Sequence, residues 1–418
     1  MKKIGIIILM IVFAITVSFV GCKKEVAPAT KEEPAEEEVE EMAPAEEEEV
    51  VEEEEKLPVK IAGIWNTTGQ QKSGGDLVAN GVMLAVKQVN ESGGILGGRM
   101  IELSIYDEGM SADVTSASVK KAINDGNVAI VGGNDATAIF KIQQLARDEG
   151  IPFSIALGSN KKILDPDMFY YYGTIHPTLY PEVSEIGLCR WFVDQGYKSM
   201  VFVSYDLQWG HDYETVFRKA FDKPDSPIEI LDVLYFPVDQ PTVELEITKA
   251  IGLNPDFIYA GFWSSSAEVS FLETTHRLGY EGGRCFPPDS MQPSAVEATP
   301  EAANGAVCTT TYLPNLSPES KAFDEAFMAE YGHIAPGAST MSYEAAMILF
   351  LGMDKAGTDS DLKKIADGMH SVDWVSPRGF KLEILPNGQV ACDSVWIAEA
   401  RDGEIVFLDE QEILPEDW

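Results

Sequence analysis

The chain has 418 residues, a formal net charge of −37 at pH 7, and 45% hydrophobic residues. This length accommodates two ordinary domains with additional segments. Nucleic-acid binding needs clustered Lys and Arg side chains that contact the phosphates, and the strongly negative net charge therefore disfavours that function. An acidic surface is consistent with a soluble domain but does not indicate a particular binding partner.

The first 22 residues have the layout of a secretory signal. Two lysines precede an uncharged apolar run over residues 4–20, which is followed by Gly21 and Cys22. The run is barely long enough to cross a membrane, so a permanent anchor explains it less well. The ending SFVGC resembles a bacterial lipobox, with Phe19 where Leu is usual. This resemblance implies cleavage before Cys22 and lipidation of that cysteine.

Residues 23–56 form an acidic tract. It contains 16 Glu and 4 Lys and almost no large apolar side chains. Such a segment cannot bury enough surface to offset the conformational entropy of the chain. We therefore expect a disordered linker between a lipidated Cys22 and the folded body.

From residue 57 onward, predicted strands and helices alternate. Strands are predicted over residues 59–64, 101–107, 127–132, 153–156, 200–204, 228–236 and 257–261, and helices through residues 82–89, 139–145, 211–222 and 241–251. This order is typical of an α/β fold with parallel sheets and helices on both faces. No internal repeat is evident.

The last hundred residues follow another pattern. Two helices are predicted over residues 318–331 and 342–356. Asn387-Gly388 and Asp402-Gly403 then each separate alternating apolar and polar runs, which is a strong signal for a β-hairpin. The C-terminus is therefore expected to be antiparallel β-structure.

Neither the cysteines nor the histidines form a catalytic or metal-binding pattern. Apart from Cys22, the cysteines are Cys189, Cys285, Cys308 and Cys392. Their spacing matches no CxxC or zinc motif. A disulfide between Cys285 and Cys308 and buried free thiols are both open interpretations. The five histidines form no HExxH motif, and GxSxG is absent. We expect no catalysis, metal or cofactor.

Several segments resemble a known family in order and spacing. VKIAGIWNTTG and GVMLAVKQVNESGGILGGRMIELSIYDEG are similar to the opening of the leucine/isoleucine/valine-binding proteins, and the similarity continues through ARDEGIPFSIALGS, SYDLQWG, DFIYAGFW and FPPDS. These are type I periplasmic binding proteins that serve ABC transporters. The resemblance covers nearly all of residues 57–418.

The resemblance implies two doubly wound parallel-sheet lobes, joined by three crossovers, with a ligand cleft between them and β-hairpins at the C-terminus. The N-terminal lobe would hold residues 57–176 and 309–372. The C-terminal lobe would hold residues 177–308 and 373–418. Ligands of open α/β sheets bind at the carboxyl ends of the strands, so the loops there are the candidate site.

Two strand-end loops of the N-terminal lobe are candidates for a ligand carboxylate. In GGNDAT, the resembled family offers a Ser hydroxyl where this chain has Ala136, followed by Thr137. Backbone N–H groups at this helix start remain available to an anion, although Thr137 as a plain cap is an equal interpretation. In ALGS, the resemblance assigns a carbonyl to Leu157 and a hydroxyl to Ser159. Ser159 as the cap of the following turn is the alternative.

The C-terminal lobe supplies aromatic residues and one acid. The resemblance places Trp209, in DLQWGHD, over the ligand, and gives a second aromatic position to Phe262 or Trp263. Trp65, at the end of the first strand, is a further candidate wall residue, with core packing as the alternative. Asp289, in FPPDS, corresponds to an acid that binds a ligand ammonium group.

These residues lead to the expectation of a monomeric, lipid-anchored receptor outside the cytoplasm, in the periplasm or on the cell surface. It would bind a branched-chain, aliphatic or aromatic amino acid and deliver it to an ABC permease in the membrane. An amide, urea, aromatic carboxylate or quaternary amine is the alternative cargo. A ligand-sensing receptor and, less favoured, a nucleotide-binding enzyme are the alternative classes.

Overall fold

The computed structural model describes residues 56–158, 160–164, 180–240, 242–288 and 290–414. Residues 1–55, which hold the signal, Cys22 and all of the acidic linker except Lys56, lie outside the described residues, as do Ser159 and Asp289. Contacts divide the chain into residues 1–54 and residues 55–418, and only the second unit is considered below. Across the described ranges, no helix is long and apolar enough to cross a membrane.

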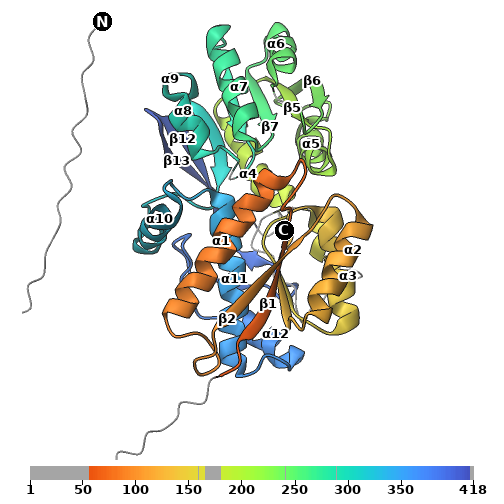
Figure 1. Ribbon diagram of the computed structural model, residues 1–418. Helices are drawn as coiled ribbons and strands as arrows, with labels where there is room; N and C mark the ends of the chain where they lie inside the picture. Colours follow the sequence, from red (N-terminus) through yellow and green to blue (C-terminus); the bar gives the residue numbers. More distant parts are fainter. Residues whose placement is uncertain (1–55, 159, 165–179, 241, 289, 415–418) are drawn as a thin grey trace, which may run out of the picture. The chain divides into compact units, whose positions relative to one another are not determined.

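A four-stranded parallel sheet organises the N-terminal part of this unit. Its order is β2-β1-β3-β4. The strands are β1 (Val59–Trp65), β2 (Ile101–Asp107), β3 (Ala129–Gly132) and β4 (Phe153–Ile155). The helices are α1 (Lys72–Glu91), α2 (Ala112–Asn124), α3 (Ala136–Glu149), the 3₁₀ helix η1 (Lys161–Leu164), α10 (Pro318–Tyr331), α11 (Gly337–Ala356) and α12 (Leu362–His370). Helices α1 and α11 cover one face, and α2 and α3 the other (Figure 1).

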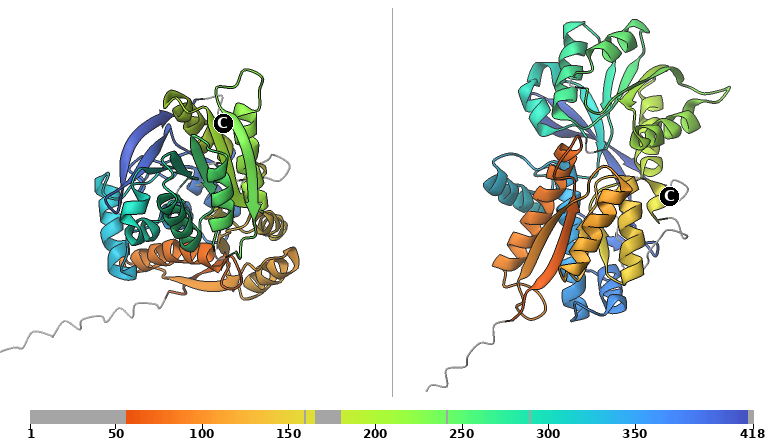
Figure 2. Two further views of the ribbon diagram at one scale, coloured as in Figure 1. Left: turned by 90° about the horizontal axis from the view of Figure 1, so that it is seen from above. Right: turned by 45° about the vertical axis from the view of Figure 1, so that its right-hand side comes forward.

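A seven-stranded sheet organises the other lobe, with the order β13-β12-β9-β8-β7-β5-β6. The strands are β5 (Ser199–Tyr205), β6 (Glu229–Phe236), β7 (Phe257–Gly261), β8 (Gly283–Phe286), β9 (Ala306–Thr310), β12 (Ser394–Arg401) and β13 (Glu404–Glu412). The helices are α4 (Pro181–Asp194), α5 (Gln208–Phe221), α6 (Glu244–Gly252), α7 (Ser265–Arg277), α8 (Pro293–Ala298) and α9 (Pro300–Ala303). Helices α4 and α5 pack on one face, and α6 and α7 on the other (Figure 2).

Continuous apolar runs form the parallel strands because both of their faces are buried. Along β5, Val201 and Val203 belong to the hydrophobic cluster under α6 and α7, whereas Met200 and Phe202 belong to the cluster under α4 and α5. Successive side chains of a strand point to opposite faces, so a fully apolar strand supplies two cores at once. The predicted α/β fold with parallel sheets is confirmed.

Both predicted C-terminal hairpins are present. Strands β12 and β13 pair antiparallel, and the residues between them, Asp402 and Gly403, have φ angles of 53° and 87°. Asparagine, aspartate and glycine tolerate this left-handed region, which explains the Asp-Gly pair. The second hairpin joins the short strands β10 (Glu383–Ile384) and β11 (Val390–Ala391).

Several boundaries differ from the expectations, and two of them bear on the arrangement of the lobes. Helix α1 begins at Lys72, ahead of the apolar periodicity, which misses the first turn because that turn carries Gly74 and Gly75 rather than apolar side chains; a Cβ on Gly75 would lie 1.9 Å from the Asn66 carbonyl oxygen. Leu382 and Val390 are buried with the first sheet, so the last connection between the sheets follows Val390 rather than lying near residue 373. The first connection includes residues 165–179, which lie outside the described ranges.

None of the four described cysteines forms a disulfide bond. Cys189, Cys285 and Cys308 are buried, and Cys392 is half-buried. Cys285 and Cys308 lie on the neighbouring strands β8 and β9, one register position apart. Of the two interpretations left open for this pair, a disulfide and buried thiols, the structure has buried thiols.

Candidate functional site

A cavity of about 250 Å³ lies where strands of both sheets end. It is lined by the segments that follow β3, β4, β5, β7 and β8, by the end of β9 and the residue after it, and by the starts of β12, α1, α4 and α11. Carboxyl ends of parallel strands are the usual ligand-binding edge of open α/β sheets. The described lining residues are Gln71, Gly74, Leu77, Asn134, Asp135, Ala136, Thr137, Leu157, Gly158, Asn160, Ser184, Leu207, Gln208, Trp209, Asp212, Tyr213, Trp263, Pro288, Ser290, Gln292, Thr309, Thr310, Thr311, Ala338, Met341 and Val395.

The loop after β3 is held in place by a buried carboxyl. Gly132 has a φ of 137°, and a Cβ there would lie 2.1 Å from the Ile64 carbonyl oxygen, so only glycine fits. The N–H groups of Asn134 and Asp135 donate to the Glu108 carboxyl oxygens at 3.0 and 2.9 Å. Burial raises the pKa of Glu108 to about 8, although these N–H groups oppose the shift.

Helix α3 starts at the cavity and is capped by its own chain. One Asp135 oxygen accepts the N–H groups of Thr137 at 2.9 Å and Ala138 at 3.3 Å. Asp135 is therefore the N-cap, and Thr137 is a first-turn residue. Ala136 and Thr137 both line the cavity, but a carboxylate already stands at this helix start. The site that we expected for a ligand carboxylate is thus partly filled by Asp135.

Three aromatic residues form one wall. Trp209 and Tyr213, on α5, have ring centroids 4.6 Å apart, and Trp263, after β7, lies 5.0 Å from Trp209 at an interplanar angle of 87°. Helical spacing puts Trp209, Asp212 and Tyr213 on one face of α5, and all three line the cavity. The neighbouring Phe262 is fully buried in the core instead.

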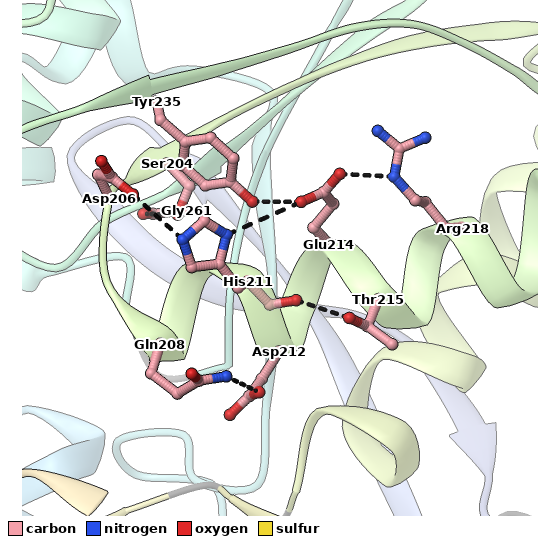
Figure 3. Close-up of polar contacts among 10 residues, drawn as sticks. All are labelled: Ser204, Asp206, Gln208, His211, Asp212, Glu214, Thr215, Arg218, Tyr235 and Gly261. Carbon is pink, nitrogen blue, oxygen red and sulfur yellow. Dashed lines mark hydrogen bonds and ion pairs between the residues drawn. The ribbon is translucent and has the colours of Figure 1, made fainter. Parts of the chain in front are cut away.

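Asp212 links the two lobes. Its carboxylate accepts the side-chain amide N–H of Asn160, which follows β4, at 2.7 Å, and that of Gln208 at 2.8 Å. Figure 3 shows Gln208 and Asp212 on one side of α5, with His211 and Glu214 on the other. His211 lies 3.1 Å from Asp206 and Glu214 binds Tyr235, so this second cluster braces α5 against β6.

Thr309 and Thr310, at the end of β9, and Thr311, which follows it, contribute three hydroxyl-bearing side chains to the lining. Thr309 Oγ1 donates to the buried Glu185 at 3.3 Å. Arg378 donates to Thr311 Oγ1 at 3.2 Å and forms a fully buried ion pair with Glu344 of α11. These contacts fix the connection between the second sheet and α11 at the cavity wall.

The structure brings five of the predicted site residues together at the cavity. They are Ala136, Thr137, Leu157, Trp209 and Trp263. Trp65 is 2% exposed and packs in the core of the first sheet, and Phe262 is 0% exposed, so neither lines the described cavity. Ser159 and Asp289 lie outside the described residues, although Gly158, Asn160, Pro288 and Ser290 beside them line the cavity.

Sequence reasoning missed several lining residues. Asp212 and Tyr213 follow Trp209 at helical spacing, a signal that could have found them. Asn160, which follows β4, and Thr309, near the end of β9, are polar residues close to strand ends, which is a weaker signal of the same kind. Gln71, in the segment that leads into α1, carries no signal, because only the packing of α1 against α11 brings that segment to the cavity.

The described lining is acidic and holds no metal site. It contains Asp135 and Asp212 but no Lys, Arg or His. Across the described ranges, no group of three or more His, Cys, Asp or Glu side chains is arranged to bind a metal ion.

The amino-acid sequence is similar to those of known binding proteins. Residues 58–404 match the family model described as periplasmic binding protein. A leucine-, isoleucine-, valine-, threonine- and alanine-binding protein from Pseudomonas aeruginosa is 22% identical over 324 residues, which are 77% of this chain and 84% of the relative.

Solved structures share the fold. A leucine-binding protein from Thermotoga maritima is 21% identical, with a TM-score of 0.72 over 86% of this chain and 100% of the other. A solute-binding protein of an ABC transporter from Rhodopseudomonas palustris, in complex with 3,4-dihydroxybenzoic acid, is 21% identical, with a TM-score of 0.76 over 86% and 99% of the two chains.

Proposed function

The chain belongs to the periplasmic binding protein family, and from this premise we propose that it is the substrate-binding receptor of an ABC importer. The observation that carries the proposal is the cavity between the strand ends of the two sheets. A ligand that contacts both lobes stabilises the closed arrangement by its differential affinity, and hinge closure presents the loaded receptor to a permease.

The first candidate ligand is an amino acid with an aliphatic or aromatic side chain. An apolar wall that can pack against such a side chain is formed by Trp209, Tyr213 and Trp263. Asp289, beside the lining residues Pro288 and Ser290, is proposed to bind the α-ammonium group. The names of the relatives that bind leucine and isoleucine support this candidate.

A second candidate is an amide, a urea or a quaternary amine in the same receptor role. Ala136 offers no hydroxyl to a ligand carboxylate, and Asp135 already caps α3. Trp faces also attract a quaternary ammonium group through cation–π interactions. An Asp289→Ala variant should sharply lose affinity for an amino acid or a quaternary amine, and should keep its affinity for an aromatic carboxylate, the remaining alternative cargo.

The receptor role is tested by mass spectrometry of small molecules released from the denatured, purified chain, followed by calorimetry with the compounds found. We expect one ligand per chain with a dissociation constant well below ~1 mM. Absence of any released molecule, together with no heat from a panel of amino acids, amides and amines, would falsify the role.

We also propose a location outside the cytoplasm with a lipid on Cys22. The SFVGC sequence and family membership support this placement. A Cys22→Ala variant expressed from the full chain should lose the acyl mass and move from the membrane fraction to the soluble fraction. Retention in the membrane without the acyl group would instead favour the apolar segment as an anchor.

A further inference from the structure

Asp212 is a half-buried carboxylate on the cavity side of α5. The amides of Asn160 and Gln208 each donate one hydrogen bond to it, one to each oxygen. A carboxylate has about four acceptor positions, so two amide donors leave others open. These donors orient the group without neutralising its charge.

The charge of Asp212 meets no cation in the described part of the chain. No ion pair includes Asp212 there, and the described cavity lining has no Lys, Arg or His. The one other acid in that lining is Asp135, and one of its carboxylate oxygens caps α3. A cavity whose described lining has two carboxylates and no base favours a positive group and disfavours an anion.

Aromatic rings stand beside this carboxylate. Trp209 precedes Asp212 by one helical turn, and Trp263 packs edge-to-face against Trp209 at 5.0 Å. Indole faces attract cations, most strongly where water is displaced. The acid and the two indoles therefore favour the same kind of ligand group.

The start of α3 is a poor binding site for the carboxylate group of an amino-acid ligand. Of the first three N–H groups of α3, those of Thr137 and Ala138 are bound by Asp135. The nearby charge of Asp135 further weakens an anion at this helix start. The start of α3 therefore offers little to a ligand carboxylate.

We infer that Asp212 is a specificity-determining residue that receives a positively charged nitrogen of the ligand and, through Asn160, couples this contact to closure of the lobes. This inference rests on the proposed receptor function and adds a second anionic contact to the one proposed for Asp289. It predicts that ligands are recognised by an amine rather than by a carboxylate.

The test uses two matched sets of probes in calorimetry with the full chain. The first set is L-leucine, isopentylamine and 4-methylpentanoate, and the second is L-phenylalanine, 2-phenylethylamine and 3-phenylpropionate. We expect the amine-bearing members of at least one set to bind at least about 10-fold more tightly than the carboxylate-only member, as for a charge-assisted hydrogen bond. A carboxylate-only probe that binds as tightly as its amine overturns the inference.

A matched pair of variants distinguishes a specific effect of Asp212 on amine binding from the effect of removing any one negative charge. Asp212→Asn should weaken amine binding by roughly 10- to 100-fold and leave carboxylate binding unchanged or stronger. Asp222→Asn, an exposed acid at the end of the same helix, should change neither. Unchanged amine affinity in Asp212→Asn overturns the inference while the receptor role stands.

The two failures are distinguishable. If no probe binds and no small molecule is released from the denatured chain, the receptor function itself fails, and the inference with it. If a released ligand is anionic, only the inference fails. The comparison among probes on the unaltered chain decides the matter even where the Asp212→Asn variant does not fold.

Discussion

Asn160 donates an amide N–H to the carboxylate of Asp212 at 2.7 Å, and the two residues come from different lobes. Asn160 follows β4 of the first sheet, and Asp212 lies on α5 beside the second sheet. Both residues line the same cavity. Their bond therefore joins the two lobes at the wall of the cavity that we propose as the ligand site.

Replacement of Asn160 by Ala should speed ligand release. The bond to a charged acceptor is half-exposed, so we expect a loss of about 1 kcal/mol, or roughly fivefold in affinity, mainly in the dissociation rate. Stopped-flow tryptophan fluorescence with the ligand found by mass spectrometry measures this rate. Gln208→Ala, which removes the partner of Asp212 within α5, is the control and should have the smaller effect. A dissociation rate equal to that of the unaltered chain would contradict the prediction.

Trp263→Ala and Phe262→Ala should separate binding from stability. Trp263 lines the cavity, so its loss should weaken binding by about 10-fold. Phe262 is fully buried against Tyr205, Phe236 and Phe286, so its truncation should cost about 3–5 kcal/mol of unfolding free energy. Urea denaturation and calorimetry on both variants check this division. The reverse pattern would show that Phe262 carries the ligand contact.

The free energy of unfolding should fall as the pH rises from about 4.5 to about 8. Burial raises the pKa of Glu185 from its ordinary 4.5 to about 8. The folded chain then binds more protons than the unfolded chain in this window, so raising the pH favours unfolding. Burial raises the pKa values of Glu108 and Glu268 as well, which gives the same sign.

Glu185→Gln should make this pH dependence shallower. The amide keeps the shape and carries no charge, so the variant should exceed the original by about 1–3 kcal/mol at pH 8 and match it near pH 4.5. Urea denaturation at both pH values measures the difference. Glu273→Gln, at an exposed position on α7, is the control and should leave the slope unchanged. An equal slope in Glu185→Gln would remove Glu185 as a cause.

Arg378→Met should destabilise the chain strongly. Arg378 and Glu344 have side chains that are 1% and 0% exposed, and Arg378 also binds Thr311 at the cavity wall. Removal of the cation leaves a buried carboxylate, which costs about 3–5 kcal/mol. Adding Glu344→Gln should recover part of this loss, and urea denaturation of single and double variants measures the coupling. No recovery in the double variant would indicate that the ion pair is not the source.

Much of the fold could be predicted from the sequence because its signals are local. The runs around Val201 and Ile258 bury both faces, and the Asp402-Gly403 pair sets a turn with positive φ angles. The positions of Trp209, Leu157 and Ala136 could be predicted too, since each follows a strand that ends at the cavity.

Other parts of the site could not be predicted because they depend on contacts between distant segments. Nothing local distinguishes Phe262 from Trp263, and only packing shows that the first fills the core and the second faces the cavity. The Asn160–Asp212 bond joins residues 52 positions apart in the chain. Asp135 as the cap of α3 is a local feature, because an Asp directly before a helix is a preferred N-cap.

By itself, the sequence determined the α/β alternation, the C-terminal hairpins and the strand-end loops, because hydrophobic periodicity and turn chemistry act over a few residues. Only the tertiary structure decided which side chains of those loops meet. The two sheets bring Asn160 and Trp209 to one cavity, send Trp65 to the core, and place Asp212 where it contacts both lobes. Side-chain packing between segments far apart in the chain makes that choice, and no local pattern encodes it.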